Sequence, residues 1–218
     1  MKRIVLILLC ILLLGTAVAG CRSNVPQETD GSIVPTDDQT PSSDPTRQTD
    51  FSEPLMQEGS ADTDSAGILQ KIWDSYGDNE RFSVYGGSVE MSVSDGPGDL
   101  DMSAVEELTT RYLMPEDQLS MVTEGASLVH LMNNNIFTAV VVRLTDGAQA
   151  QSFANAWREI IRNNRWLCGQ PDRLIIAQPD GEHILMAFGS QDAMMLFRGK
   201  LSAAFPGSKE LYQEAIVA

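Results

Sequence analysis

The two histidines are the first side chains to weigh for chemistry, because histidine can act as a general base or a metal ligand near neutral pH. His130 and His183 are the only histidines in the 218 residues, and both fall in stretches that predict strands, so the two could lie near each other. A metal site needs three or four ligands in a defined geometry, and no HxH, HxxxH or CxxC spacing is present. A strand histidine with a satisfied hydrogen bond is favoured over a ligand, and we predict no metal and no other cofactor.

Three arginines form the only basic stripe in an acidic chain. Arg158, Arg162 and Arg165 lie at positions i, i+4 and i+7 of one predicted helix. Guanidinium groups suit bidentate contact with anions and carboxylates, so the stripe is our candidate face for a ligand or partner. The alternative is a solvated helix face, on which Arg162 and Arg165 are also favoured by their place near the helix C-terminus.

The N-terminus has the pattern of a secretory signal. Lys2 and Arg3 precede the apolar run 4–14, and small residues then lead to Cys21. The run is about half of the roughly 20 residues that span a bilayer, so a retained transmembrane helix is not expected. Val18-Ala19-Gly20-Cys21 resembles the bacterial lipobox. The resemblance implies cleavage before Cys21, lipid on its thiol with acyl chains such as palmitate, and an extracytoplasmic position on the cell membrane. An ordinary secreted protein with a chance cysteine is the alternative.

Cys168 is the only cysteine of the sequence outside the predicted signal peptide and the lipobox. With Cys10 removed and Cys21 lipidated, no intramolecular disulfide can form. A buried, small apolar side chain is the favoured interpretation of Cys168, and a reactive or intermolecular thiol is the alternative. Trp157 and Trp166 are expected in the core, although an exposed tryptophan would be a platform for a ligand.

Catalytic and nucleotide-binding motifs are absent from the sequence. The glycines at 86–87 and 96–98 lack the spacing of a phosphate-binding loop, and no serine lies in a GxSxG or SxxK setting. A scattered active site stays open, because catalytic triads assemble from distant residues. We predict that the protein is not an enzyme.

Charge restricts the partners. Without residues 1–20 the chain keeps 13 Lys and Arg against 30 Asp and Glu, a net charge of −17. Nucleic-acid binding depends on cations that meet phosphates, so no nucleic acid is expected. Anionic lipid headgroups would also repel the chain, so its membrane contact should be the lipid on Cys21.

Three segments follow from composition. Residues 1–20 are the predicted signal peptide. Residues 21–64 begin with the lipidated cysteine and are rich in Ser, Thr, Pro and acids, which predicts a disordered acidic tether of roughly 35 Å average span. Residues 65–218 predict one globular domain.

An α+β fold is predicted for that domain. Two hairpin–helix units, at 127–164 and 173–205, should form one antiparallel sheet of about four strands with helices mainly on one face. Residues 136–144 are apolar on both parities, which predicts a central strand that pairs with the second hairpin. Helices are expected from Ser103 in a capping box with Glu106, at 147–164 after Asp146, after Ser190, and again near 211–216.

The layout resembles the uncharacterised DUF4358 family of clostridial lipoproteins. The features that prompt this are the lipobox, the acidic tether, the strand with Val140-Val141-Val142, the long helix that ends near Trp166, and the strand 184–188. No catalytic motif defines that family, so the resemblance implies a surface lipoprotein and no site residues.

These patterns favour a non-enzymatic binding or interaction module, tethered outside the cell, with an envelope protein as its expected partner. The alternatives are a small-ligand-binding accessory lipoprotein of a transporter, or, less favoured, an envelope hydrolase. A cleft lined by Trp and Arg would favour the first alternative, and a nucleophile within hydrogen-bond reach of His130 or His183 would favour the second.

Overall fold

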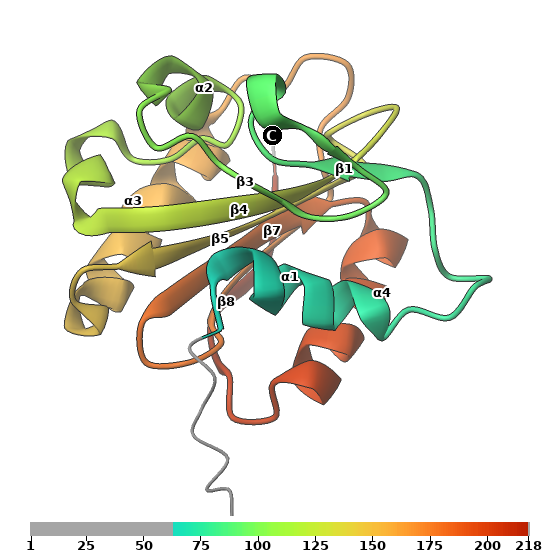
Figure 1. Ribbon diagram of the computed structural model, residues 1–218. Coiled ribbons are helices and arrows are strands. Elements are labelled where there is room, and N and C mark those ends of the chain that lie inside the picture. The colour runs from blue at the N-terminus through green and yellow to red at the C-terminus, as the bar shows by residue number, and fades with distance from the viewer. Residues whose placement is uncertain (1–62, 218) are drawn as a thin grey trace, which may run out of the picture. The chain divides into compact units, whose positions relative to one another are not determined.

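The computed structural model describes residues 63–217, and the elements below belong to that part of the chain (Figure 1). Cys21, the lipobox and most of the predicted tether lie outside the described residues. The helices are α1 (Ser65–Asp74), α2 (Val105–Thr110), α3 (Ala150–Asn163) and α4 (Gln191–Ala204). Short 3-10 helices are found at Val89–Met91, Glu116–Met121 and Gly147–Gln149. The strands are β1 (Val84–Gly86), β2 (Val93–Ser94), β3 (Gly98–Asp99), β4 (Val122–His130), β5 (Phe137–Leu144), β6 (Arg173–Gln178), β7 (His183–Gly189) and β8 (Lys209–Ala215).

The strands form one antiparallel sheet in the order β2-β1-β4-β5-β7-β6-β8, with β3 paired to β4. The two predicted hairpins are β4–β5 and β6–β7, and β5 pairs with β7 along its whole length, from Phe137↔Gly189 to Arg143↔His183. The α+β class, the hairpins and the central place of β5 are therefore confirmed. The predicted size of about four strands is wrong, because the described sheet has eight.

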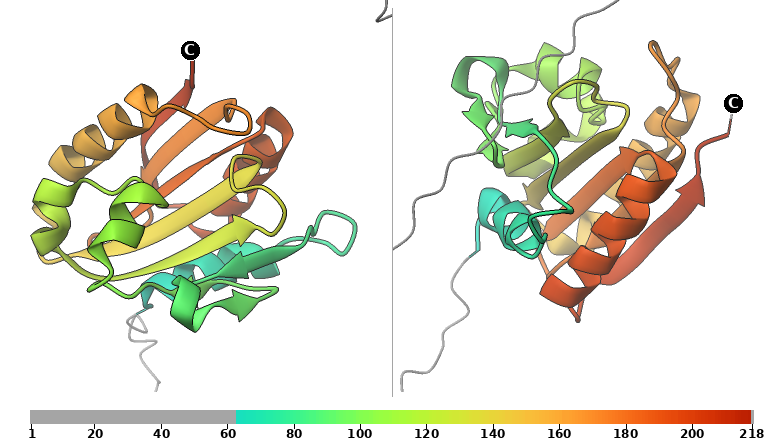
Figure 2. Two further views of the ribbon diagram at one scale, coloured as in Figure 1. Left: turned by 90° about the horizontal axis from the view of Figure 1, so that it is seen from above. Right: turned by 90° about the vertical axis from the view of Figure 1, so that its right-hand side faces the viewer.

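Helices cover both faces of the sheet (Figures 1 and 2). On one face, Val140, Val142 and Ile176 pack against α3, which buries Phe153 and Trp157. On the other face, the alternate residues of the same strands pack against α1 and α4. The prediction of helices mainly on one face is therefore wrong. Strands β5, β6 and β7 are apolar on both parities, and such strands need cover on both sides.

The last element is a strand where a helix was predicted. Leu211, Tyr212, Ala215 and Ile216 fit a helical spacing, but β8 pairs with β6 from Arg173↔Ala215 to Gln178↔Lys209. An irregularity in this pairing lies between Ile176 and Ala177 of β6. Two steps along β8, from Tyr212 to Glu210, match a single step along β6. This bulge interrupts the alternation of side chains between the two faces, so the sequence of β8 does not show the two-residue period of a strand.

Helix ends follow side-chain chemistry in most cases. Asp146 accepts a hydrogen bond from the Ala148 amide, and Ser190 caps α4 through the Ala193 amide, as predicted. The capping box at Ser103 is wrong, because the Ser103 hydroxyl donates to Asp101 and α2 begins at Val105 without a side-chain cap. Among residues 63–217, no helix is long and apolar enough to cross a bilayer.

Candidate functional site

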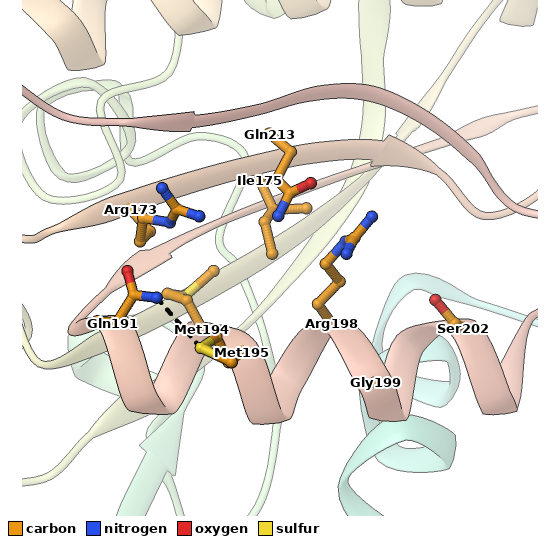
Figure 3. A pocket seen from close by; sticks show the side chains of 9 residues that line it. All are labelled: Arg173, Ile175, Gln191, Met194, Met195, Arg198, Gly199, Ser202 and Gln213. Atoms are coloured by element: carbon orange, nitrogen blue, oxygen red, sulfur yellow. Dashed lines mark hydrogen bonds between the residues drawn. The ribbon is translucent and has the colours of Figure 1, made fainter.

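A groove of about 350 Å³ lies between α4 and the β6–β8 edge of the sheet (Figure 3). Its sheet side is formed by Arg173, Ile175 and Gln213. Its other wall is the side of α4 that is turned toward these residues. We call this the α4 groove. The α4 wall is lined by Gln191, Met194, Met195, Arg198, Gly199 and Ser202.

Strand register explains the sheet side of the α4 groove. Gln213 pairs with Ile175, and Ala215 pairs with Arg173. Residues that pair across an antiparallel sheet point to the same face, so Arg173, Ile175 and Gln213 all face α4. The helix itself buries Met194, Phe197 and Leu201 against the core and leaves the intervening polar residues along the groove.

The middle of the helical wall is a glycine. Gly199 lies inside α4, where glycine costs about 1 kcal/mol relative to alanine. A Cβ atom built at Gly199 would meet no heavy atom within 4 Å. Packing within the described part of the chain therefore does not require this glycine, and its missing side chain leaves the groove wider at that point.

Two arginines give the groove its charge. The Arg198 Nε donates to Glu210 Oε2 at 2.7 Å, and its Nη2 donates to Oε1 at 3.3 Å, so this charge is neutralised by β8. The half-buried Arg173 has no hydrogen-bond or ion-pair partner within residues 63–217. No Asp or Glu of the described residues lines the α4 groove. In a chain with twice as many acids as bases, a guanidinium without a partner in the described residues is unusual, and its planar donors suit an anion.

The predicted arginine stripe, on and just after α3, lies on the face of the sheet opposite the α4 groove. Arg158 donates to both carboxylate oxygens of Glu214, at 2.8 and 2.7 Å, and its guanidinium lies 4.8 Å from the Tyr212 ring centroid. Those hydrogen bonds raise the pKa of Arg158 above its ordinary value. Arg162 lies 3.9 Å from Glu214 Oε1, whereas Arg165 is exposed and has no partner among residues 63–217. A role of the three in ligand or partner binding stays a prediction, and Arg158 has a structural role in holding β8.

The two histidines lie at opposite ends of the sheet. Thr138 pairs with Val129, next to His130, whereas Arg143 of the same strand pairs with His183. The five intervening steps of strand span roughly 17 Å, so the expectation that the histidines lie close together is wrong. His130 accepts hydrogen bonds at Nδ1 from the amides of Met132 and Asn133, which satisfies one side of its ring.

His183 is buried in a polar cluster. Its Nδ1 lies 2.8 Å from Asp180 Oδ2, and its Nε2 accepts a hydrogen bond from Arg143 Nε at 3.2 Å. Ser65 donates its hydroxyl to Glu124 Oε1 at 3.2 Å, not to the imidazole. No Ser or Cys of residues 63–217 forms a hydrogen bond with His183, whose ring nitrogens lie against Asp180 and Arg143. The cluster instead links α1 to the ends of β4, β5 and β7.

The loop after α3 overturns the favoured interpretation of Cys168. Cys168 is exposed, and its backbone φ is +62°. The neighbouring Leu167 is 81% exposed, because the loop runs outside the core. Trp157 is fully buried and donates from Nε1 to Tyr112 O at 3.0 Å, as expected of a core residue. Trp166 is partly buried and packs on Phe188 with ring centroids 5.0 Å apart.

Comparisons with protein-family models, curated proteins and solved structures find no match to this chain. The resemblance to the DUF4358 lipoproteins stays a prediction. Among residues 63–217, no three His, Cys, Asp or Glu side chains are grouped as a metal site requires. A larger hollow of about 750 Å³ beside α2 is lined by Glu106, Glu107 and Arg111, and this arginine is paired with Glu107. We select the α4 groove as the candidate site because its Arg173 guanidinium has no partner among residues 63–217. Sequence reasoning did not select its residues, although a glycine inside a helical pattern was a usable signal.

Proposed function

We propose that this protein is a lipid-anchored lipoprotein on the extracytoplasmic side of the cell membrane, and that its folded domain is a non-catalytic binding module. The anchor rests on the lipobox pattern at Cys21. The binding role rests on one observation, the α4 groove, which combines an unpaired guanidinium with apolar side chains. Ligand sites commonly combine a mostly apolar lining with a few polar groups that fix orientation.

The size of the groove favours a small ligand or a short segment of a larger partner. A volume of about 350 Å³ lies at the lower end of the range for small-molecule pockets. The alternative function, a small-ligand-binding accessory lipoprotein of a transporter, is therefore supported by the same observation. The hydrolase alternative gains no support, because Nε2 of His183 already accepts a hydrogen bond from Arg143 Nε.

The anchor is tested by replacing the predicted lipidation site. We expect Cys21→Ser to abolish labelling by a radioactive fatty acid and to release the protein from the membrane. Cys168→Ser is the matched control, because it removes the other cysteine that would remain after cleavage and should keep both properties. Unchanged labelling of Cys21→Ser would overturn the lipid anchor.

The binding role is tested by crosslinking in intact cells. A photoreactive side chain in place of Ser202, which lines the α4 groove, should give a discrete adduct. The same side chain at Glu159, an exposed residue of α3 on the other face of the sheet, is the control and should not give that adduct. Gly199→Leu should remove the adduct by filling the groove. Identical adducts from both positions, or none at 202, would contradict the proposal.

A further inference from the structure

We infer that the α4 groove recognises a carboxylate joined to a small apolar body, with Arg173 as the residue that binds the carboxylate. This inference rests on the proposed binding function and names the chemistry of its ligand. The carboxylate is either that of a small free acid or the C-terminal carboxylate of a peptide.

Arg173 differs from most cations of the domain in having no acidic partner. Arg111, Arg158 and Arg198 each bind a carboxylate within about 3 Å, at 3.1, 2.7 and 2.7 Å. A half-buried guanidinium without a counter-ion lacks the compensation that the others have, and a bound carboxylate would supply it through two parallel hydrogen bonds.

The other charged donor of the groove, Arg198, is already paired with Glu210, which leaves Arg173 as the cation that can bind an anion. At the start of α4, the Gln191 amide donates to Asp172 Oδ2 at 2.8 Å, and the Ala193 amide donates to Ser190 Oγ. These two backbone amides of the first turn of α4 therefore already have acceptors. The Gln213 side chain has no hydrogen-bond partner among the described residues and projects into the groove, so its amide can donate to the same ligand (Figure 3).

Charge around the groove favours a carboxylate over a phosphate. Asp172 lies next to Arg173 in the chain, and Glu210 already neutralises Arg198. A phosphate carries more charge than a single free guanidinium balances, and it would meet these acids. A monoanionic carboxylate matches one planar, two-pronged donor.

The apolar part of the ligand has a surface of its own. Met195 is 63% exposed and lines the groove, the nearly buried Ile175 and Met194 lie beneath it, and methionine adapts its shape to irregular partners. Gly199 keeps the adjoining wall free of side-chain atoms. An aliphatic group of leucine size is therefore the apolar body that we choose to probe this surface.

The probes are N-acetyl-L-leucine, its neutral amide and the peptide acetyl-Gly-Gly-Gly-Leu, titrated at low salt into residues 21–218 carrying Cys21→Ser, with nitrogen-15 NMR shifts as the readout. We expect the two acids to shift groove resonances and the amide to bind at least about tenfold more weakly, the factor that about 1.4 kcal/mol represents. Tighter binding of the peptide would indicate a C-terminal segment, and tighter binding of the amino acid would indicate a small acid.

Variants separate charge from fold. Arg173→Gln should weaken binding of the acids about tenfold, while Lys209→Gln, which removes an exposed cation that does not line the groove, should leave it unchanged. Gly199→Leu should block binding, and Gly199→Ala should preserve it. Thermal melting of each variant confirms that it is folded.

Equal binding of acid and amide, equal affinity of Arg173→Gln and the parent, or no shift of groove resonances would each overturn the carboxylate assignment. The proposed binding function is judged separately by the crosslink at position 202, so the two can fail independently.

Discussion

Two buried tyrosine hydroxyls have opposite surroundings. The Tyr76 hydroxyl has no hydrogen-bond partner among residues 63–217, and its ring packs against Trp73 at the end of α1. Burial, with a smaller contribution from the charge of Glu80, raises the pKa of Tyr76 well above its ordinary value. The Tyr112 hydroxyl donates to Gly87 O at 2.9 Å and accepts from Ser127 Oγ at 3.1 Å. The same chemical group should thus destabilise at one position and stabilise at the other.

Removal of each hydroxyl tests this difference. Tyr76→Phe should raise the free energy of unfolding by up to about 1 kcal/mol, because an unsatisfied buried hydroxyl is lost. Tyr112→Phe should lower it by about 1–2 kcal/mol, because two buried partners lose their hydrogen bonds. Urea denaturation measures both. A loss of stability in Tyr76→Phe would mean that its hydroxyl has a partner, such as a buried water.

Asp180 organises the turn between β6 and β7. Its carboxylate accepts hydrogen bonds from the amides of Glu182 and His183, each at 2.8 Å, and lies against the His183 ring. Burial acts to raise the pKa of Asp180, but these amide hydrogen bonds and the interactions with His183 outweigh it, so the pKa lies below its usual value. The ionised carboxylate therefore stabilises the fold.

The sign of that shift predicts a pH dependence. A lowered pKa in the folded state means that the contribution of Asp180 is complete above its unfolded pKa, near 4, and is lost as the pH falls through the folded value. The side chain is 41% exposed, so we expect Asp180→Asn to cost only about 1 kcal/mol at pH 7, and less at pH 3. Urea denaturation at both pH values checks this, with the exposed Asp78→Asn as the control. An equal cost at both values would contradict the assignment.

At the scale of elements, the edge strand β8 is held from both faces of the sheet. Arg158 of α3 binds Glu214 on one face, and Arg198 of α4 binds Glu210 on the other. The irregularity in the β6–β8 pairing makes this arrangement possible. It lies between Glu210 and Glu214, so the two side chains point to opposite faces of the sheet. Without it, Glu210 and Glu214 would point to the same side.

The two ion pairs should differ in strength. Glu214 is 25% exposed and receives two short hydrogen bonds from a guanidinium that also stacks on Tyr212, whereas Glu210 is 39% exposed. We expect Glu214→Gln to lower the free energy of unfolding by about 1–2 kcal/mol and Glu210→Gln by less than about 0.5 kcal/mol. Amide hydrogen exchange in β8 should accelerate in the first variant. The reverse order would show that burial does not decide the contribution of these pairs.

Sequence patterns predicted those helices and strands whose conformation depends mainly on their own residues. The strand 136–144 is apolar on both parities, so its central place was evident. The two-residue strand β3 has no such pattern, since it depends on close backbone contact with β1: a Cβ on Gly86 would lie 2.3 Å from Gly98 N. Strand β8 was predicted as a helix because its bulge breaks the alternation of its side chains.

At the scale of the molecule, the site was harder to predict than the fold. The α4 groove joins residues from β6, α4 and β8, and none of these forms a motif with its neighbours in sequence. Arg173 becomes notable only when the partners of the other cations are known. The second helical layer could have been predicted, because strands buried on both parities require it.

The two edges of the sheet bear on how densely copies of the protein can gather. One edge is β2, a strand of only two residues, and the other is β8, whose sequence KELYQEA carries three charges. Short or charged edges discourage pairing with the backbone of another chain. If the protein is lipid-anchored as we propose, the membrane would hold many copies in a thin layer, and such edges would let the domains crowd together without forming a shared sheet.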